Sequence, residues 1–151
     1  MTTAPAIVRH ANPLVRWLLR AGAPMGPNIL LTVRGRRTGT PRTAPVAIAE
    51  IEGRLFVIGA YGDVNWVRNL RAAGHGQIRS RDRDVHVTAH ELDRAAASTF
   101  YREAMPAFVG RLPLLGRLFV RVLFAVAGPE ILSDPVRAAE AHPVFELRPV
   151  P

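Results

Sequence analysis

Short segments with strand character follow one another from Asn28 to Leu92, and this pattern constrains the fold more than any other feature. The runs "NILLTV", "RTAPVAIAE" and "RLFVIGA" are rich in β-branched and apolar residues, and a tight glycine turn joins the last two. After one short helical segment, "GQIRSR" and "DVHVTAHEL" continue the series, and "VFELR" adds a strand near the C-terminus. Five or six strands in mostly sequential hairpins predict an antiparallel sheet curled into a small barrel with helices outside it, hence an α+β fold.

The helical segments are marked by their first and last residues. One helix begins at Asn12, a capping residue followed by proline, and ends at Gly22. Further helices are expected over "NWVRNLRAAG", from Asp93 to Met105, from Pro113 to Ala127 and over "DPVRAAEAH". Pro45 interrupts the second strand, which places that segment at a sheet edge or a bulge because proline cannot donate a ladder hydrogen bond.

The length of 151 residues, nearly half of them apolar, predicts one domain with a sizeable core. Within residues 1–151 we expect an N-terminal amphipathic helix and linker (1–27), a barrel core (28–92), a helical insertion (93–142) and a final strand (143–149). No signal-peptide pattern is visible, and Arg121 interrupts the longest apolar run, "LFVRVLFAVAG". We therefore expect a soluble, cytoplasmic protein.

Cysteine and lysine are both absent, and all 20 basic residues are arginines. This excludes disulfides, thiolate metal sites, a cysteine nucleophile, Schiff-base chemistry and the phosphate-binding loop that ends in lysine. His86 and His90 share a strand face but lie about 13 Å apart, too far to chelate one ion. The other histidines, His10, His75 and His142, are isolated in loops or at ends. We expect no metal site, and no pattern supports acyl transfer or glycoside hydrolysis.

The net charge of +8 invites a nucleic-acid interpretation, because basic surfaces attract polyanions. The arginines are scattered, however, and no recognition helix, zinc pattern or ribonucleoprotein motif accompanies them. An anionic small ligand fits better. Nucleic-acid binding is the remaining alternative. A steep salt dependence of binding to duplex DNA would support it.

The loop "RGRRTGTPRTAPV" packs its arginines between residues that hold a fixed shape. Gly35 and Gly39 can adopt positive φ and let backbone N–H groups converge on an anion. Arg36, Arg37 and Arg42 offer planar forks suited to phosphate and carboxylate, and threonines add hydroxyl donors. The alternative for the loop taken alone is a solvated hairpin tip.

The stretch "GAYGDVNWVRNL" favours a ligand site, rather than a solvated hairpin tip, as the role of the arginine-rich loop. Gly59 and Gly62 end a strand and allow a planar ligand to approach the main chain. On the helix that follows, Asn69 lies beside Trp66, and a buried amide must either tie down neighbouring backbone or touch a ligand. Core packing accounts for at least part of the role of Trp66.

Taken together, "ILLTVRGRRTGTPRTAPV", "EGRLFVIGAYGDVNWVRNLRAAG" and "IRSRDRDVHVTAHEL" resemble the deazaflavin-dependent nitroreductase family. The family pattern is a strand, G-R-[KR]-[ST]-G-x-x-R-x-x-P, a hairpin, and W-x-x-N-L. The similarity covers roughly Asn28 to Leu92. It implies a mostly antiparallel split β-barrel of the FMN-binding type with peripheral helices. It also implies coenzyme F420, an 8-hydroxy-5-deazaflavin, as the cofactor, and hydride transfer to a nitro, quinone or activated-alkene acceptor.

The resemblance also implies roles for individual residues. The basic loop that holds the anionic phospholactyl and glutamate tail matches Arg36, Arg37, Thr38, Gly39 and Arg42. Pro45 and Val46 would pass near the ring system, Ala60, Tyr61 and Gly62 match the strand-end segment beside the deazaflavin, and Trp66 and Asn69 match the helix that follows. The chain departs from the family at "AYGD", where many members carry a serine, a basic residue and two glycines.

Hydride transfer needs orientation, electrostatics and exclusion of water rather than a nucleophile or a metal, so the missing residue types are no objection to it. Tyr61 is the candidate proton donor, with bulk water as the alternative. Two other functions keep the same fold: an FMN-dependent split-barrel reductase, and a non-catalytic protein that binds the deazaflavin or a hydrophobic ligand.

Two expected helices carry arginines four residues apart on otherwise apolar surfaces. Arg16 and Arg20 lie on the first, Arg117 and Arg121 on the helix from Pro113 to Ala127. Packing on the barrel or a homodimer contact is the default interpretation. The alternative is that these helices wall a hydrophobic pocket or lean on a membrane, which suits a quinone or lipid-like acceptor.

Overall fold

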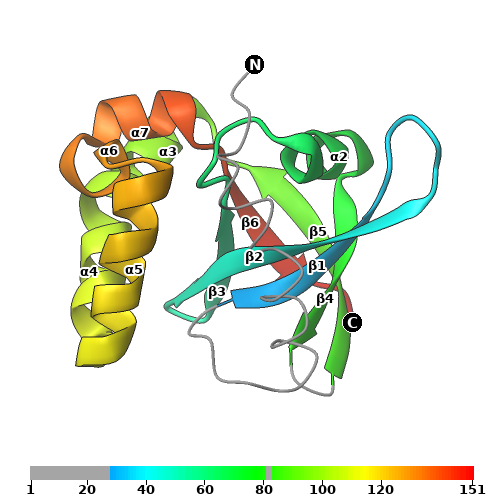
Figure 1. Ribbon diagram of the computed structural model, residues 1–151. Coiled ribbons are helices and arrows are strands. Elements are labelled where there is room, and N and C mark those ends of the chain that lie inside the picture. The colour runs from blue at the N-terminus through cyan, green and yellow to red at the C-terminus, as the bar shows by residue number, and fades with distance from the viewer. Residues whose placement is uncertain (1–27, 81–82) are drawn as a thin grey trace.

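The computed structural model describes residues 28–80 and 83–151, and within them six strands form a closed barrel (Figure 1). The strand order around the barrel is β1-β2-β3-β6-β5-β4, and every neighbouring pair is antiparallel. The strands are β1 (Asn28–Arg34), β2 (Pro41–Ile51), β3 (Arg54–Ile58), β4 (His75–Ser80), β5 (Arg83–Glu91) and β6 (Val144–Pro149). The antiparallel barrel and the α+β class predicted from the sequence are confirmed; the expected helix from Asn12 to Gly22 lies outside the described residues.

The turns explain why these strands pair in sequence. Glu52 and Gly53 join β2 to β3 with φ values of 52° and 74°, the left-handed pair that a two-residue hairpin needs. Pro45 lies opposite Leu30 of β1, in the half of β2 that precedes its pairing with β3 at Ile48. This part of β2 therefore pairs with β1 alone, which agrees with the predicted edge position.

Two apolar cores lie back to back on the two faces of the barrel wall. On β3, Val57 points into the barrel with Leu31 and Phe145, whereas Phe56 points outward to the helices. This alternation follows the two-residue period of a strand, so a single strand serves both cores. Helix α2 (Asn65–Ala73) adds Val67 and Leu70 to the barrel interior.

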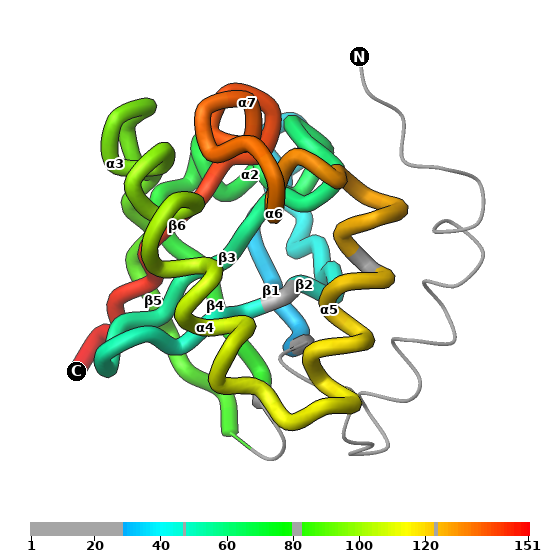
Figure 2. The backbone as a smooth tube through the Cα atoms, turned by 90° about the vertical axis from the view of Figure 1, so that its left-hand side faces the viewer, coloured from blue at the N-terminus to red at the C-terminus, as the bar shows by residue number. Residues whose placement is uncertain are grey.

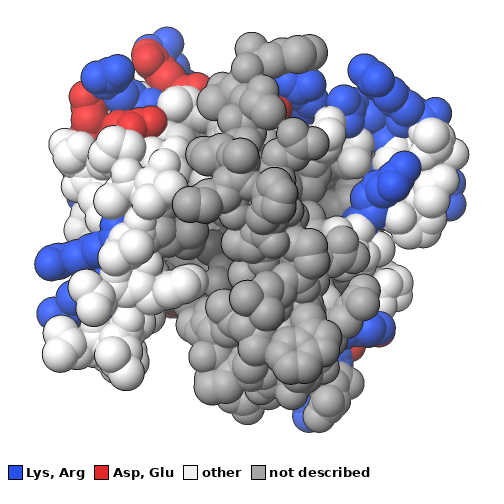
Figure 3. Space-filling model, viewed as in Figure 1, with Lys and Arg blue, Asp and Glu red and all other residues white. Residues whose placement is uncertain are grey.

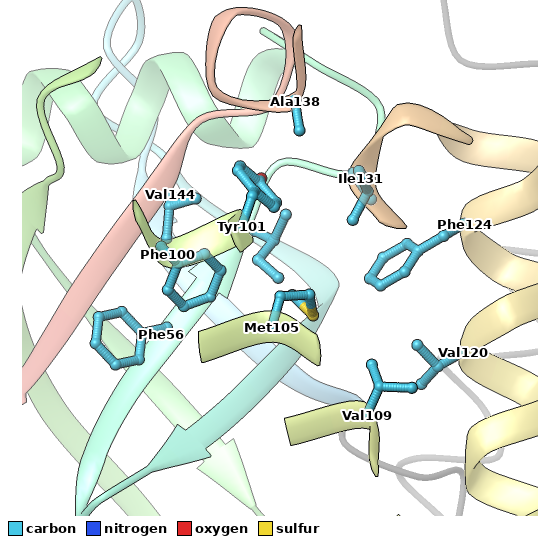
Figure 4. Close-up of a cluster of buried hydrophobic side chains, with 12 residues drawn as sticks. Phe56, Phe100, Tyr101, Met105, Val109, Val120, Phe124, Ile131, Ala138 and Val144 are labelled. Atoms are coloured by element: carbon cyan, nitrogen blue, oxygen red, sulfur yellow. The ribbon is translucent and has the colours of Figure 1, made fainter. Parts of the chain in front are cut away.

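The second core joins the barrel to a layer of helices (Figures 2 and 4). Figure 4 shows Val120 and Phe124 pointing from α5 (Leu114–Ala127) toward Val109 and Met105 of the neighbouring helix. The rings of Phe56 of β3 and Phe100 pack in a tilted arrangement, with their centroids 5.1 Å apart. The helical insertion is therefore anchored on the outer face of the barrel by aromatic packing.

The predicted end of the first insertion helix at Met105 is wrong. α3 (Arg94–Thr99), a π-helical turn η1 (Phe100–Ala104) and α4 (Met105–Arg111) form one continuous helical stretch. The N–H of Met105 reaches back five residues to Phe100, and Pro106 follows directly. The widened turn shifts the hydrogen-bond register where proline has no N–H to donate, so the helix continues past it.

α5, α6 (Glu130–Ser133) and α7 (Pro135–Ala141) complete the layer and lead back to β6. α6 was not expected from the sequence, because four residues are too few to show helical periodicity. Asp134 caps α7 by accepting a hydrogen bond from the N–H of Arg137 at 3.1 Å. Within the described residues, each helix is too short or too polar to cross a bilayer.

One buried carboxylate holds the closing strand. Glu146 of β6 accepts two hydrogen bonds from Arg54, both at 2.9 Å, and one from Arg148 at 3.1 Å. These guanidinium hydrogen bonds lower the pKa of Glu146 from 4.5 to about 2. A carboxyl whose folded pKa is depressed stabilises the fold above its unfolded pKa, and this contribution is lost as the pH falls through the folded value.

The substitution Glu146→Gln should therefore lower the free energy of unfolding at pH 7 by about 1–2 kcal/mol, since both arginine partners are more than half exposed and screened by solvent. The difference between the two proteins should shrink from pH 4.5 to pH 2, the interval of the lowered pKa. Urea unfolding at several pH values measures it. A difference that stays constant down to pH 2 would mean that the ion pairs contribute nothing.

Candidate functional site

The tip of the β1–β2 hairpin is a shaped loop held by its own backbone. The N–H of Gly35 donates to the carbonyl of Thr40 at 2.9 Å, and the N–H of Gly39 donates to the carbonyl of Gly35 at 2.8 Å. Gly39 has φ 72°, and nothing lies within 4 Å of where its Cβ would be. The loop therefore combines a left-handed glycine with open space beside its arginines.

A buried amide ties this loop to α2. The Oδ1 atom of Asn69 accepts hydrogen bonds from the backbone N–H of Arg36 at 3.2 Å and from its guanidinium Nη1 at 2.8 Å. Asn69 is buried, and its Nδ2 group donates to no described residue. Of the two roles that the sequence left open for Asn69, the structure supports the tie to backbone.

The other arginines of the hairpin keep their charge uncompensated within the described part of the chain. Arg37 and Arg42 are exposed, and neither forms an ion pair with a described residue. The sequence from residue 28 to 49 contains no acidic residue. Thr38 accepts a hydrogen bond from the N–H of Thr40 at 3.3 Å, so its hydroxyl proton is still free to be donated.

The arginines of α2 are engaged elsewhere. Arg71 bonds Asp63 at 2.7 Å and Glu91 at 2.6 Å, and Arg68 bonds Asp63 at 2.9 Å. The hydrogen bond from Arg71 is the main reason that the pKa of Asp63 lies below its ordinary value. These pairs fasten α2 to the preceding loop and to β5, and they leave the hairpin as the cationic part of this end of the barrel.

The strand-end segment Gly59–Gly62 turns directly after β3. The N–H of Gly62 donates to the carbonyl of Gly59 at 2.8 Å, and Gly62 has φ 79°. A Cβ at Gly59 would lie 3.0 Å from both the Gly62 carbonyl and Val67, so the turn has no room for one. Ala60 is buried in the core beside the helices, whereas Tyr61 is half-buried against it. Burial raises the pKa of the Tyr61 hydroxyl, which stays protonated at neutral pH.

Three further residues of the predicted cofactor site are at least half-buried. Val46 is 4% exposed in the barrel interior, and Trp66 packs against the same core. Pro45 is half-buried. A ligand can therefore meet Val46 and Ala60 only through their backbone, while Pro45, Tyr61 and Trp66 retain accessible side-chain surface.

A buried histidine behind the strand-end segment was missed by sequence reasoning. His142, expected to be isolated, is 4% exposed, and its Nε2 lies 2.6 Å from Glu130 Oε1. Its Nδ1 lies 3.2 Å from the carbonyl of Gly59. Both ring nitrogens therefore have a polar partner within the protein. A Cβ at Gly128 would lie 2.4 Å from this ring, so only glycine fits there.

This pairing joins α6 to the start of the strand-end segment. The only signal in the sequence was a glycine and a glutamate shortly before the histidine, which is too common a pattern to be read as a contact. No group of three or more potential metal ligands exists within residues 28–80 and 83–151. His86 and His90, which share a strand face, are both exposed.

A family model described as F420H(2)-dependent quinone reductase matches residues 10–111. The chain belongs to this family. It is thus an F420-dependent oxidoreductase with coenzyme F420 as its cofactor. The match includes the hairpin, the strand-end segment and α2, and it ends before α5.

Solved structures share the fold at low sequence identity. HutZ, a heme storage protein from Vibrio cholerae, is 14% identical with a TM-score of 0.53 over 92% of this chain and 89% of its own. A conserved hypothetical protein from Mycobacterium tuberculosis is 11% identical, with a TM-score of 0.52 over 84% of this chain and 75% of its own. An F420-H2 dependent reductase, FDR-A, is 19% identical with a TM-score of 0.49 over 81% and 94%. No curated protein matches the chain. The predicted split β-barrel of the FMN-binding type is confirmed.

The residues present fit the cofactor of the quinone reductase family. Its anionic tail needs cationic and N–H donors, and the hairpin presents Arg37 and Arg42 without a neutralising carboxylate. The open space beside Gly39 leaves the backbone accessible. The side-chain donors therefore agree with an anion bound at the hairpin. The backbone differs from the expectation: of the two loop glycines only Gly39 has positive φ, and the N–H groups of both are bonded within the loop.

The tie between hairpin and helix can be tested. Asn69→Leu removes the acceptor that holds Arg36 and should weaken F420 binding about tenfold, because the loop then has to be ordered on binding. Asn65→Leu is the matched control, since Asn65 lies exposed on the same helix. Fluorescence titration of both variants with F420 measures the effect. Equal affinities would show that the tie does not position the loop.

Proposed function

We propose that this member of the family transfers a hydride from reduced F420 to a quinone. The observation that carries the proposal is the cationic hairpin, pinned through Arg36 to Asn69 at the end of the barrel where β3 gives way to Gly59–Gly62. The bound reduced deazaflavin supplies the hydride. The protein's contribution is binding, orientation and exclusion of water.

Each part of the proposed site has a separate task. Arg37, Arg42 and the Thr38 hydroxyl bind the anionic tail, while Arg36 and Asn69 fix the shape of the loop. The strand-end segment offers its backbone to the ring, since Gly62 brings no side chain between them. Tyr61, kept protonated by burial, donates a proton to the reduced acceptor.

The acceptor is the finer part of the proposal. Tyr61 and Trp66 leave accessible aromatic surface, which favours a planar apolar acceptor such as a quinone. Nitro compounds and activated alkenes, the other acceptors suggested by the sequence resemblance, are the competing substrates. Oxidation of reduced F420, followed by its absorbance, should be faster with a benzoquinone or naphthoquinone than with a nitroarene or an enone of similar size.

The cofactor and the occurrence of turnover are tested in the same assay. F420 and FMN are titrated separately into the purified protein. Tight binding of FMN with none of F420 would contradict the proposal. Binding of reduced F420 without oxidation by any acceptor would favour the non-catalytic binding protein. Sedimentation velocity of the same samples tests whether the chain forms the homodimer that the apolar helices suggested.

A further inference from the structure

The outer face of α5 carries most of the large apolar side chains that are exposed on the described part of the chain. Among those residues nine large apolar side chains are exposed, and six of them lie on α5. They are Leu114 (76%), Leu115 (80%), Leu118 (58%), Phe119 (38%), Val122 (58%) and Val126 (55%). At about 100° per residue they fall within an arc of about 140° on one side of the helix.

The opposite side of α5 is already used. Val120 and Phe124 are buried in the core that joins the helices to β3 (Figure 4). Arg117 donates from Nη2 to the carbonyls of Gly110 at 3.0 Å and Leu112 at 3.3 Å, which fixes the turn between α4 and α5. The exposed arc is therefore held on a packed helix rather than on a loose one.

The charged residues of α5 and of the chain immediately before it are all basic. From residue 104 to 129 the chain contains no acidic residue, and its charged residues are Arg111, Arg117 and Arg121. Arg111 and Arg121 are exposed. In Figure 3 the acidic side chains of the helical side gather at the top left, and the flank below them is uncharged with arginines at its edge.

We propose that this face of α5 docks on the surface of an anionic lipid bilayer. A helix of 14 residues is about 21 Å long, shorter than the hydrocarbon core of about 30 Å, so it lies in the interface instead of spanning it. The leucines and valines enter the boundary between headgroups and acyl chains. Arg111 and Arg121 meet the negative headgroups.

A second copy of this chain fits the surface less well. A twofold contact would set the same patch against itself, so exposed arginines would meet arginines with no carboxylate from either α5 between them. α5 itself lies beyond residues 10–111, the part of the chain that the family model matches. Its inner side shares a core with Ala60 and Tyr61, which would bring the candidate site close to a lipid-dissolved acceptor.

The test is flotation of the full chain with vesicles of phosphatidylcholine alone or mixed with phosphatidylglycerol, at about 0.1 M salt. The parent should bind the anionic vesicles. The double substitution Leu115→Glu and Leu118→Glu should lower the binding constant at least about tenfold, because two apolar side chains no longer leave water. Val150→Glu is the matched control, an exposed apolar residue at the C-terminal end.

Both leucines are exposed, so thermal unfolding and turnover of a water-soluble quinone should be unchanged in the double variant. If the parent does not turn over the water-soluble quinone, the proposed function is contradicted. The measured vesicle binding then still tests the docking proposal by itself. Equal vesicle binding by parent and double variant would overturn the docking proposal. The proposal would also be overturned if the parent does not bind vesicles and the double substitution converts a dimer into a monomer. The exposed face of α5 would then be a contact between two copies of the chain.

Discussion

Arg37→Glu should raise the dissociation constant for F420 about 100-fold and leave the barrel folded. The guanidinium is exposed at the hairpin tip and bonds no described residue, so its loss costs the fold nothing. In the complex, the substitution removes a charge-assisted hydrogen bond to the anionic tail and introduces a repelling carboxylate, together worth about 3 kcal/mol. Fluorescence titration with F420 at low and moderate salt measures the constant.

The matched control for this prediction is Arg83→Glu. It makes the same change in charge at an exposed position of β5, by the turn between β4 and β5 at the other end of the sheet (Figure 1). A general electrostatic effect of net charge would weaken binding in both variants alike. If Arg37→Glu binds the deazaflavin as tightly as the parent, the hairpin is a solvated surface and the cofactor lies elsewhere.

Tyr61→Phe should lower kcat about 100-fold while the dissociation constant for F420 stays near the parent value. The hydroxyl has no partner among the described residues, and burial keeps it protonated by raising its pKa. Because the protonated form is the active one, the parent should hold its kcat up to about pH 10 and lose it only above. Steady-state rates with a quinone acceptor across pH measure both effects.

Tyr101 provides the conservative control for this variant. Its hydroxyl is buried and donates to the carbonyl of His142 at 2.8 Å. Tyr101→Phe should therefore lower stability by about 1 kcal/mol and leave kcat unchanged. A kcat for Tyr61→Phe within about threefold of the parent, below the usual contribution of a general acid, would assign the proton to water.

The sequence by itself determined the strands and their sequential hairpins, β1–β2, β2–β3 and β4–β5, whereas the pairing of β1 with β4 and of β6 with β3 and β5 was decided by the tertiary structure. Alternating apolar residues and the left-handed turn at Glu52 and Gly53 are local features, and they fix hairpin register without help from the rest of the chain. The cationic hairpin and the buried amide at Asn69 could be predicted for the same reason. Glycine spacing and a high density of arginines can be recognised in a short stretch of sequence. The predicted helix end at Met105 was wrong because no local sequence pattern indicates the π-helical turn that accommodates Pro106.

Only the tertiary structure decided which polar groups meet. Asn69 reaches Arg36 across 33 residues, and His142 reaches Gly59 across 83, distances over which sequence spacing says nothing about contact. Tertiary packing also decided which atoms of the candidate site a ligand can reach. The side chains of Val46 and Ala60 are buried in the two cores, so only their backbone is left for a ligand. The same packing determines which apolar residues of α5 are buried and which are exposed. The helix is apolar on nearly all sides, so its buried face is defined only by the elements that pack against it.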